Sequence, residues 1–318
     1  MSIALIIGKD ETERKRREKQ ISLWHEALSK LIDHVEIHIY PAIPEPEAVE
    51  FAVCWSQPEG VFNEFPNLKC ISSSGAGVNH LVNDNSIKDG VAIVRVADPK
   101  LSRDMAHYVI QAALNHTREY SRFKQSQQQK YWDQFPPFNT TDKNTVGVMG
   151  IGEIGSYIAQ ALSHIQIPTI GYSRSKKIIT GIETYEHAQL DTFLNLSHIL
   201  VCTLPLTSQT TGIINQELIN KLPDDAYIIN IGRGAHINEA DLLNALDNNK
   251  LSGAKLDVFN QEPLAKDHPF WSHPKIELTP HNAAVSDPFS AAICVADNYK
   301  RMQSHQPLCY QVNKEKGY

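Results

Sequence analysis

The sequence has few cysteines, no long apolar run and no excess of positive charge. Its 318 residues include five cysteines, an odd number, and no two of them have CxxC spacing. Most of these cysteines sit in apolar runs, so we expect buried thiols in a reducing compartment and neither disulfides nor a metal site. No stretch approaches the roughly 18 apolar residues of a membrane span, and MSIALIIG is too short for a signal-peptide core. A cytoplasmic protein that does not enter the membrane is expected.

A basic surface is also missing, because the formal net charge is −6. Lysine and arginine are scattered except in KDETERKRREKQ at residues 9–20, which mixes both signs and leads into an apolar stripe at Ile21, Trp24, Leu28 and Leu31. This pattern is typical of the solvated start of a surface helix, with a binding patch as the alternative. Nucleic acid is therefore not an expected partner. The chain also has no repeat of fixed period, which argues against a solenoid.

Short apolar runs alternate with helical patterns along most of the chain. The first hundred residues contain IALIIG, VEIHIY, FAVCW, LKCISSSGAG and VAIVRV; residues from 145 onward contain TVGVMG, IPTIGYS, HILVCTLP, AYIINIG, LSGAKLDVF and IELTPHNAA. Strands that alternate with helices predict parallel sheets covered on both faces, so the fold class is α/β, and the second series predicts a doubly wound sheet. The intervening segment, residues 98–132, has a helical pattern and could link two domains.

Three glycines interrupt the run VGVMGIGEIG. In a strand, turn and helix, Gly150 allows the tight turn, Gly152 leaves room for a pyrophosphate, and Gly155 lets the helix pack closely on the sheet. The free N–H groups of the helix N-terminus would then face the phosphates. A tight turn in an unrelated α/β protein is the alternative for such a motif taken alone. The buried strand before it and the clear helix after it favour a dinucleotide site.

The end of the next strand indicates which dinucleotide is preferred. An NAD site would carry an acidic residue there, whereas this sequence reads GYSRSKK, with Ser173, Arg174 and Ser175 followed by Lys176 and Lys177. Hydroxyls and positive charge suit a 2′-phosphate. NADPH is therefore the predicted cofactor, with NAD also possible, and a solvated basic turn is the alternative interpretation.

Three polar residues at strand ends are candidates for chemistry. Arg233 lies between two glycines after an apolar run, Glu262 follows a strand and precedes a proline, and His281 follows Pro280. Ligands of open α/β sheets bind beyond the carboxyl ends of the strands, so these side chains could converge. An arginine can hold a carboxylate with two hydrogen bonds, a histidine exchanges a proton near neutral pH, and a neighbouring glutamate favours the charged imidazole. Taken singly, each residue could equally have a structural role.

The segments VGVMGIGEIG, IINIGRGAHINEADLLNAL, AKLDVFNQEPL and LTPHNAA, in this order, resemble the D-isomer-specific 2-hydroxyacid dehydrogenases, and among them the glyoxylate/hydroxypyruvate reductase A type. The similarity extends from about Leu68 to the last helix. It implies two Rossmann-like domains with a cleft between them. These are a dinucleotide-binding domain at 101–284 and a discontinuous substrate domain at 1–100 plus 285–318.

The resemblance also implies roles for particular residues. Arg233 would bind the 2-oxo acid, His281 would be the acid/base, and Glu262 would pair with His281. The amides of the loop SSGAG would help to hold the substrate carboxylate, and further residues would line the cofactor site. The implied substrate residues are Gly75, Ala76, Gly77, Arg233 and His281; the implied cofactor residues are Gly150, Gly152, Glu153, Ile154, Gly155, Ser173, Arg174, Ser175, Thr203, Leu204, Pro205, Ile231, Gly232 and Asp257.

The implied reaction is the NADPH-dependent reduction of a small 2-oxo acid, glyoxylate or hydroxypyruvate, with His281 as general acid. A homodimer is expected through the linking helix and the loop at 132–138, whose aromatic residues could also pack on their own domain. His107 departs from the family, whose members often have an acidic residue there. Two alternatives are another substrate on the same fold and a non-catalytic protein that senses dinucleotide.

Overall fold

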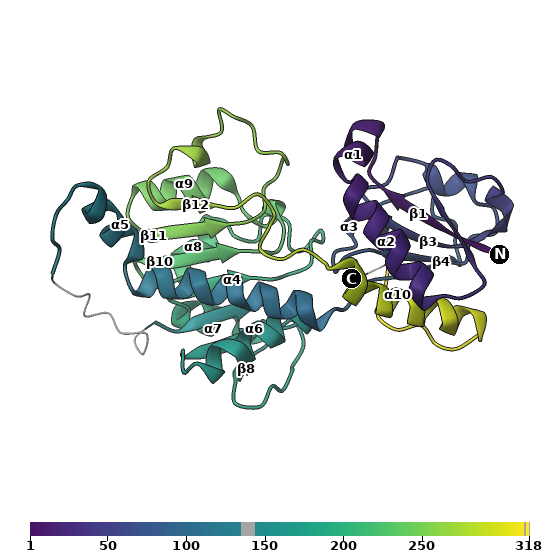
Figure 1. The fold of residues 1–318 in the computed structure, drawn as a ribbon. Coiled ribbons are helices and arrows are strands. Elements are labelled where there is room, and N and C mark those ends of the chain that lie inside the picture. Colours follow the sequence, from purple (N-terminus) through teal and green to yellow (C-terminus); the bar gives the residue numbers. More distant parts are fainter. Residues whose placement is uncertain (135–143, 315, 318) are drawn as a thin grey trace. The chain divides into compact units, whose positions relative to one another are not determined.

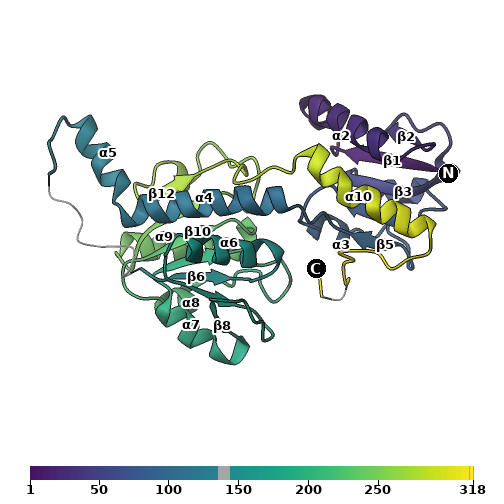
Figure 2. The same ribbon diagram turned by 60° about the horizontal axis from the view of Figure 1, so that its bottom comes forward.

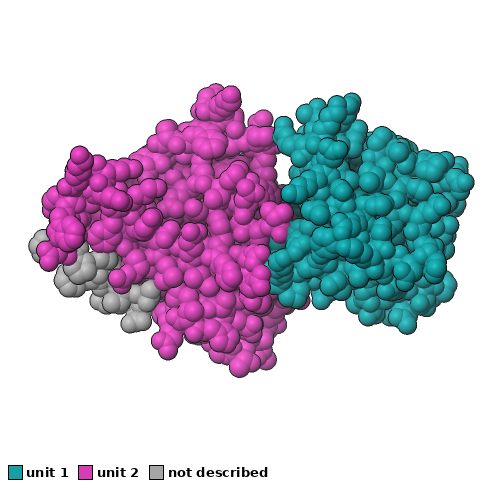
Figure 3. Space-filling model, viewed as in Figure 1, with its two compact units in different colours: residues 1–101, 286–318 teal, residues 102–285 magenta. Residues whose placement is uncertain are grey.

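The computed structural model describes residues 1–134, 144–314 and 316–317. The chain divides into two compact units: unit 1 contains residues 1–101 and 286–318, and unit 2 contains residues 102–285 (Figure 3). One boundary falls inside a helix, α4 (Pro99–Thr117). Unit 2 is therefore one continuous stretch of chain inserted between the two parts of unit 1.

Unit 1 is built on a parallel five-stranded sheet in the order β2-β1-β3-β4-β5. Figure 1 labels β1, β3 and β4 of this sheet. This order is that of flavodoxin-like sheets, with the topological switch beside β1. The strands are β1 (Ser2–Ile7), β2 (Glu36–Ile39), β3 (Val49–Trp55), β4 (Cys70–Ser73) and β5 (Ala92–Val94). The helices are α1 (Glu11–Arg16), α2 (Glu18–Leu31), η1 (Pro46–Ala48), η2 (Val61–Glu64), α3 (Asn79–Val82) and α10 (Pro288–Gln303).

Apolar side chains cover both faces of this sheet. On one face α2 and α10 pack together, with Trp24 and Leu28 of the first helix and Val295 of the second buried in one cluster. On the other face Phe62 and Leu81 belong to a second buried cluster. All six residues of β1 are buried, and its successive side chains point alternately into the two clusters.

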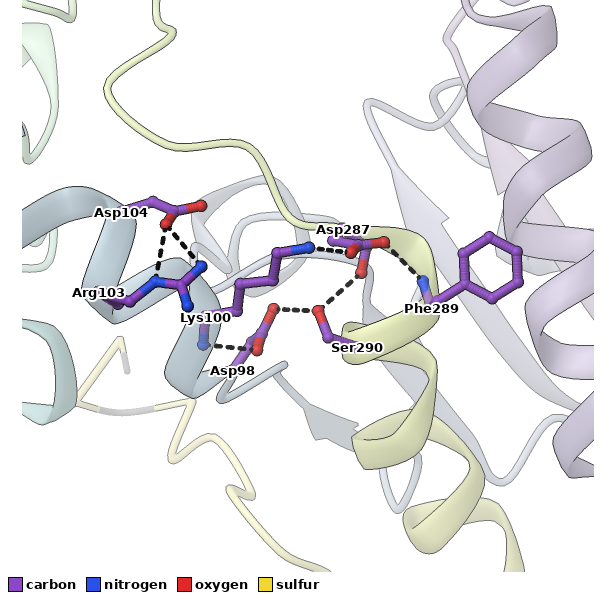
Figure 4. A network of polar contacts seen from close by, with 7 residues as sticks. All are labelled: Asp98, Lys100, Arg103, Asp104, Asp287, Phe289 and Ser290. Carbon is purple, nitrogen blue, oxygen red and sulfur yellow. Dashed lines mark hydrogen bonds and ion pairs between the residues drawn. The ribbon is translucent and has the colours of Figure 1, made fainter. Parts of the chain in front are cut away.

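A polar network joins the first turns of α4 and α10 within unit 1 (Figure 4). The buried carboxylate of Asp98 accepts hydrogen bonds from the Lys100 amide at 2.9 Å and from the Ser290 hydroxyl at 2.8 Å. The Lys100 ammonium pairs with Asp287, whose carboxylate also caps α10 by accepting from the Phe289 amide at 3.0 Å. The two points at which the chain leaves and re-enters unit 1 are thus tied together.

Unit 2 is built on a parallel seven-stranded sheet in the order β12-β11-β10-β9-β6-β7-β8. The strands are β6 (Val146–Met149), β7 (Thr169–Tyr172), β8 (Glu183–Tyr185), β9 (Ile199–Cys202), β10 (Ala226–Asn230), β11 (Leu251–Leu256) and β12 (Ile276–Leu278). The remaining helices are α5 (Tyr120–Gln128), α6 (Glu153–His164), η4 (His187–Gln189), α7 (Leu190–Leu196), α8 (Gln216–Lys221), η5 (Gly234–His236), α9 (Glu239–Asp247) and η6 (Pro269–Trp271). The strand order reverses between β6 and β9, as in Rossmann folds.

Helices lie on both faces of this sheet (Figure 2). The helices α4 and α6 share one buried cluster with the sheet, which includes Val109 and Ile158. The helices α7, α8 and α9 share the opposite cluster, which includes Phe193, Ile219 and Leu242. The predicted α/β class with two doubly wound parallel sheets is confirmed.

The structure departs from the sequence expectations in two places. The sheet of unit 2 has a seventh strand, β8, which the sequence does not reveal because it is a three-residue edge strand in which only Tyr185 is buried. The helical segment expected at 98–132 is two helices, α4 and α5, separated at Glu119, whose φ of 51° is left-handed. A residue in that conformation ends a right-handed helix.

The five cysteines are free, as expected. Three of them, Cys54, Cys70 and Cys202, are buried, and Cys294 and Cys309 are half-buried. Burial raises the pKa of the Cys202 thiol to about 12, so this group stays protonated.

Candidate active site

The glycine turn after β6 is shaped by steric limits. Gly150 has a φ of 112°, a conformation that L side chains rarely adopt. A Cβ on Gly155 would lie 2.0 Å from the Gly150 carbonyl oxygen, so only glycine allows α6 to pack this closely on the turn. Thr203, at the end of the neighbouring strand β9, donates a hydrogen bond to the same carbonyl at 2.5 Å. This turn therefore has a fixed shape.

The N-terminus of α6 is open. Gly152 is its N-cap residue, and a Cβ built there would meet nothing within 4 Å. Among the described residues, no side chain caps this end of the helix, and Glu153 and Ile154 occupy its first turn. Unpaired backbone N–H groups at a helix N-terminus, together with the helix dipole, attract anions. The residues present here fit the pyrophosphate of a dinucleotide.

The turn after β7 carries the predicted hydroxyls and positive charges. Ser173 donates to the Ser175 carbonyl at 2.6 Å, and Arg174 donates to the Gln209 side chain at 3.2 Å. Lys177 reaches back to the glycine turn, where its ammonium donates to the Ile151 carbonyl at 2.8 Å. A lysine charge is thus held beside the glycine turn, and Arg174 is exposed to solvent.

Arg233 lies directly after β10, beyond Ile231 and Gly232. Its guanidinium donates to the Gly232 carbonyl at 2.7 Å, and burial lowers its pKa while the charge of Glu262 opposes that shift. The buried Asn230 holds this turn, since its amide donates to the Arg233 carbonyl at 2.9 Å and its oxygen accepts from the Gly232 amide at 3.1 Å. The guanidinium is therefore carried on a rigid turn.

Glu262 and His281 form a hydrogen-bonded pair. His281 Nδ1 lies 2.7 Å from Glu262 Oε2, and the second carboxylate oxygen accepts from the Phe259 amide at 3.0 Å. Burial raises the pKa of Glu262, but the bonds from His281 and Phe259 outweigh it, so the pKa is lowered overall. The carboxylate is therefore charged at neutral pH and holds one edge of the imidazole.

The turns of Arg233 and Glu262 lie against each other. A Cβ on Gly234 would lie 1.9 Å from the Phe259 carbonyl carbon, so the backbone next to Arg233 packs directly on the segment that holds Glu262. The structure thus brings together the three residues Arg233, Glu262 and His281 at the carboxyl ends of β10, β11 and β12.

Asp257 organises the loop that carries His281. It is 1% exposed, and its Oδ1 accepts from the Thr279 hydroxyl at 2.7 Å and from the amides of Asn282 and Ala283 at 2.8 and 3.0 Å. Its Oδ2 is buried and has no hydrogen-bond partner within the described part of the chain. Buried carboxylate oxygens normally have a hydrogen-bond partner, so Asp257 Oδ2 is suited to accept a hydrogen bond from a bound ligand.

Sequence reasoning missed Thr279 and Tyr108. The Thr279 hydroxyl donates its hydrogen bond to Asp257, so at its 2.6 Å contact with Tyr108 it is the acceptor and the Tyr108 hydroxyl is the donor. Burial raises the pKa of Tyr108, so it remains a donor. Its neighbour His107 is exposed on α4. The only signal for Thr279 in the sequence is its place two residues before His281.

The predicted substrate loop lies in unit 1, between β4 and α3. Ser73 braces it, donating to the Gly77 carbonyl at 2.8 Å and accepting from the Gly75 amide at 3.3 Å. Gly75 packs against the Trp55 ring, which a Cβ would approach to 2.9 Å, and Ala76 is half-buried. The loop is thus a shaped turn in which Ala76 and Gly77 are half-buried.

Two features are absent from the described residues. Their His, Cys, Asp and Glu side chains form no group of three that could hold a metal ion. Within the same part of the chain, no helix combines the length and apolar character needed to cross a membrane.

Residues 110–283 match the model of the D-isomer specific 2-hydroxyacid dehydrogenase, NAD binding domain. The chain belongs to this family, so it is an oxidoreductase of the 2-hydroxyacid dehydrogenase class, as the sequence resemblance indicates. A curated relative, the glyoxylate/hydroxypyruvate reductase A of Salmonella newport, is 34% identical over 301 residues, which is 93% of this chain and 96% of the relative.

Solved structures agree over the whole chain. A D-isomer specific 2-hydroxyacid dehydrogenase from Xanthobacter autotrophicus Py2, in complex with NADPH and MES, has a TM-score of 0.92 at 32% identity and covers 100% of this chain and 99% of its own. An NADPH-dependent glyoxylate/hydroxypyruvate reductase from Sinorhizobium meliloti, in complex with NADP and sulfate, has a TM-score of 0.90 at 34% identity, with complete coverage of both chains.

Proposed function

We propose that this enzyme reduces glyoxylate or hydroxypyruvate to the corresponding 2-hydroxy acid with NADPH. The observation that carries the proposal is the 2.7 Å pair of His281 Nδ1 and Glu262 Oε2 beside the half-buried Arg233, in the unit that holds the glycine turn. The S. meliloti reductase of the same fold is named for these substrates and for NADPH. The A-type relative is likewise named a glyoxylate/hydroxypyruvate reductase.

The cofactor would be held by residues of unit 2. The pyrophosphate would rest on the N–H groups of Glu153 and Ile154. The Gly152 amide instead donates to the Gly150 carbonyl at 3.0 Å, and Gly150 and Gly155 shape the turn. The segment Thr203, Leu204 and Pro205, and the residues Ile231 and Gly232, would line the nicotinamide side, and Asp257 Oδ2 would accept from the carboxamide. Ser173, Arg174 and Ser175 would bind the 2′-phosphate. The bound nicotinamide would supply the hydride for the carbonyl carbon of the substrate.

The substrate would be oriented by charge. The Arg233 guanidinium would bind the carboxylate of the 2-oxo acid with two hydrogen bonds, aided by the amides of Ala76 and Gly77, while the Gly75 amide, which donates to Ser73, shapes the loop. Units 1 and 2 would accordingly act as substrate and dinucleotide-binding domains.

His281 would supply the proton. Its Nδ1 is engaged with Glu262, so Nε2 is the atom left to face the substrate. A doubly protonated imidazole would give its Nε2 proton to the carbonyl oxygen, with Nδ1 held by the charged carboxylate of Glu262. Together with the hydride supplied to the carbonyl carbon, this proton would yield the 2-hydroxy acid.

Nicotinamide absorbance with glyoxylate or hydroxypyruvate tests this proposal, with NADPH and NADH compared side by side. We expect oxidation of NADPH to be fast and that of NADH slow. His281→Ala should lower kcat by at least about 100-fold, the range of general acid catalysis, and leave NADPH affinity unchanged. An unchanged kcat would refute the role of His281. NADPH binding without turnover of either acid would point to another substrate or to a sensor.

We also propose that the enzyme acts in the cytoplasm as a homodimer. The free cysteines suit a reducing compartment. Trp132 is 84% exposed and Tyr131 is 61% exposed, so a second copy could cover them. Phe135 and Phe138, predicted for the same loop, lie outside the described residues. Sedimentation of the wild type and of Trp132→Ser tests the dimer, which the variant should weaken.

A further inference from the structure

His236 lies at the end of the short helix that follows Arg233. It is 0% exposed, and its Nδ1 accepts a hydrogen bond from the Arg233 backbone N–H at 3.0 Å. Its own backbone is also fixed, because the His236 carbonyl accepts from the Ile214 amide at 2.8 Å. One edge of this imidazole therefore holds the turn that carries the guanidinium.

The other edge of the ring reaches a different segment. His236 Nε2 lies 3.3 Å from the carbonyl oxygen of Pro205, which also accepts from the Thr210 hydroxyl at 2.7 Å. Pro205 follows β9, whereas His236 follows β10, so the ring bridges the ends of neighbouring strands. Gly232 makes room for it, since a Cβ there would lie 2.8 Å from His236 Nδ1 and 3.2 Å from the Leu204 carbonyl.

The two contacts require one particular form of the ring. Because Nδ1 accepts from Arg233, the proton of a neutral imidazole must be on Nε2, which then donates to Pro205. Burial lowers the pKa of His236 to about 4, and the Arg233 charge adds to this shift, so the ring is neutral at physiological pH. Both hydrogen bonds therefore persist together.

We propose that His236 is a positioning residue that couples the Arg233 turn to the cofactor segment Leu204–Pro205. This inference rests on the proposed function, which assigns the carboxylate to Arg233 and the cofactor to that segment. Cofactor binding fixes Leu204–Pro205, and His236 transmits this constraint to the arginine turn. NADPH and a substrate-like anion thus strengthen each other's binding, and the coupling depends on both edges of the ring.

Two substitutions separate the edges of the ring. The amide of His236→Asn places an acceptor where Nδ1 lies, so it keeps the Arg233 contact and loses Pro205. The longer amide of His236→Gln places a donor near the Nε2 position, so it keeps Pro205 and loses the Arg233 contact. The ligands are NADPH and oxalate, a dicarboxylate that resembles a 2-oxo acid and accepts no hydride. Calorimetry of each ligand alone and with the other present needs no turnover.

We expect wild-type oxalate affinity to rise about tenfold or more when NADPH is bound, a typical coupling between sites. His236→Gln should weaken oxalate binding about tenfold, because it leaves the Arg233 amide unpaired, and should change the NADPH Kd by less than threefold. His236→Asn should weaken NADPH binding about fivefold. The loss is smaller because the Thr210 hydroxyl still donates to the Pro205 carbonyl. In the absence of NADPH, the oxalate Kd of this variant should stay within about threefold of the wild type. Both variants should lower the coupling to below about threefold.

The matched control is Asn230→Ala. It removes hydrogen bonds from the other side of the Arg233 turn and does not involve Pro205. It should weaken oxalate binding and retain the coupling. A purely structural role for His236 predicts equal losses for both ligands in both variants, with the coupling unchanged, and that result would overturn the inference. Wild-type protein that binds NADPH but not oxalate would also overturn it.

The experiments distinguish a failure of the proposed function from a failure of the role proposed for His236. If the wild type couples NADPH to oxalate but turns over neither glyoxylate nor hydroxypyruvate, the assigned substrates are wrong and the role of His236 stands. If the wild type reduces these acids but the two variants show no split between ligands, the role of His236 is wrong and the reductase assignment stands.

Discussion

The turns after β1 and β6 occupy the same topological place in their sheets, yet only one of them leaves a helix N-terminus open. Each turn begins with a glycine of positive φ, Gly8 at 97° and Gly150 at 112°. After β1, Asp10 accepts from the Glu13 amide at 2.8 Å, and Glu13 accepts from the Lys9 amide at 3.1 Å. After β6, α6 has no comparable cap among the described residues.

The two turns also differ in charge, because the residues that cap the turn after β1 are carboxylates. Burial raises the pKa of Glu13, but the bonds from Lys9 and Arg17 outweigh it, so the pKa is lowered and the carboxylate stays charged. The turn after β1 is thus filled by the chain's own anions, whereas the turn after β6 can accept one from outside. Strand order creates the place for a phosphate, and the side chains in the turn decide whether it is available.

The largest effect should come from closing the second turn. Gly155→Ala places a methyl group 2.0 Å from the Gly150 carbonyl, so the turn must move; we expect NADPH affinity to fall at least about 100-fold and stability to fall by about 1–3 kcal/mol. Gly8→Ala is the control, since its φ of 97° also imposes strain of about 1–3 kcal/mol. Calorimetric titration and thermal unfolding measure both effects. Equal loss of NADPH binding in the two variants would contradict the comparison.

Gly152→Asp would make the second turn resemble the first. The site has room for the side chain, and an aspartate there caps α6. Its charge opposes the pyrophosphate, so we expect NADPH affinity to fall about tenfold or more without loss of thermal stability. Gly152→Asn gives the same cap without the charge. If both variants bind NADPH equally weakly, steric blockage and not charge distinguishes the two turns.

Arg174→Leu tests whether the turn after β7, like the turn after β6, binds a phosphate of the cofactor. A charge-assisted hydrogen bond contributes about 1.5–3 kcal/mol, so NADPH should bind about tenfold to 100-fold more weakly while NADH affinity stays the same. Lys176→Ala, a change of an exposed charge in the same turn, should have a smaller effect. Paired Kd values for the two cofactors provide the measurement. Parallel losses for NADPH and NADH would rule out a contact with the 2′-phosphate.

The smallest effect is expected in the first turn. Asp10→Ala removes the cap of α1 and should cost about 1 kcal/mol of stability, while NADPH affinity stays within about twofold. Asp10→Asn retains an acceptor and should be close to the wild type. Chemical denaturation measures the stability. A change in NADPH affinity here would show that the turn after β1 takes part in cofactor binding.

The sequence alone predicts the class of fold because buried parallel strands are apolar along their whole length, as in the runs that became β1, β6 and β9. It does not predict β8, whose Glu183 and Thr184 contribute no apolar pattern. The break at Glu119 is also invisible, since a left-handed glutamate has no composition signal of its own.

The sequence predicts which residues form the site but not all of their contacts. The carboxyl ends of parallel strands meet at one edge, so Arg233, Glu262 and His281 can be expected near one another from their positions alone. The hydrogen bond of His236 to Pro205 cannot be expected, because residues 31 positions apart meet only when β9 and β10 pair. Asp257 Oδ2, which has no partner in the part of the chain that the structure describes, likewise depends on how the loop after β12 folds. The catalytic roles of the three residues stay predictions.

The insertion of unit 2 into unit 1 has a consequence for synthesis on the ribosome. The strands of unit 1 are complete by Val94, but α10, which covers one face of their sheet together with α2, begins at Pro288. At roughly 5–20 residues per second, the part of that face that α2 leaves open stays exposed for roughly 10–40 seconds. Unit 2 is continuous and can fold within that interval. The nascent chain therefore needs protection at the first unit it makes, and the last helix to emerge completes the first sheet.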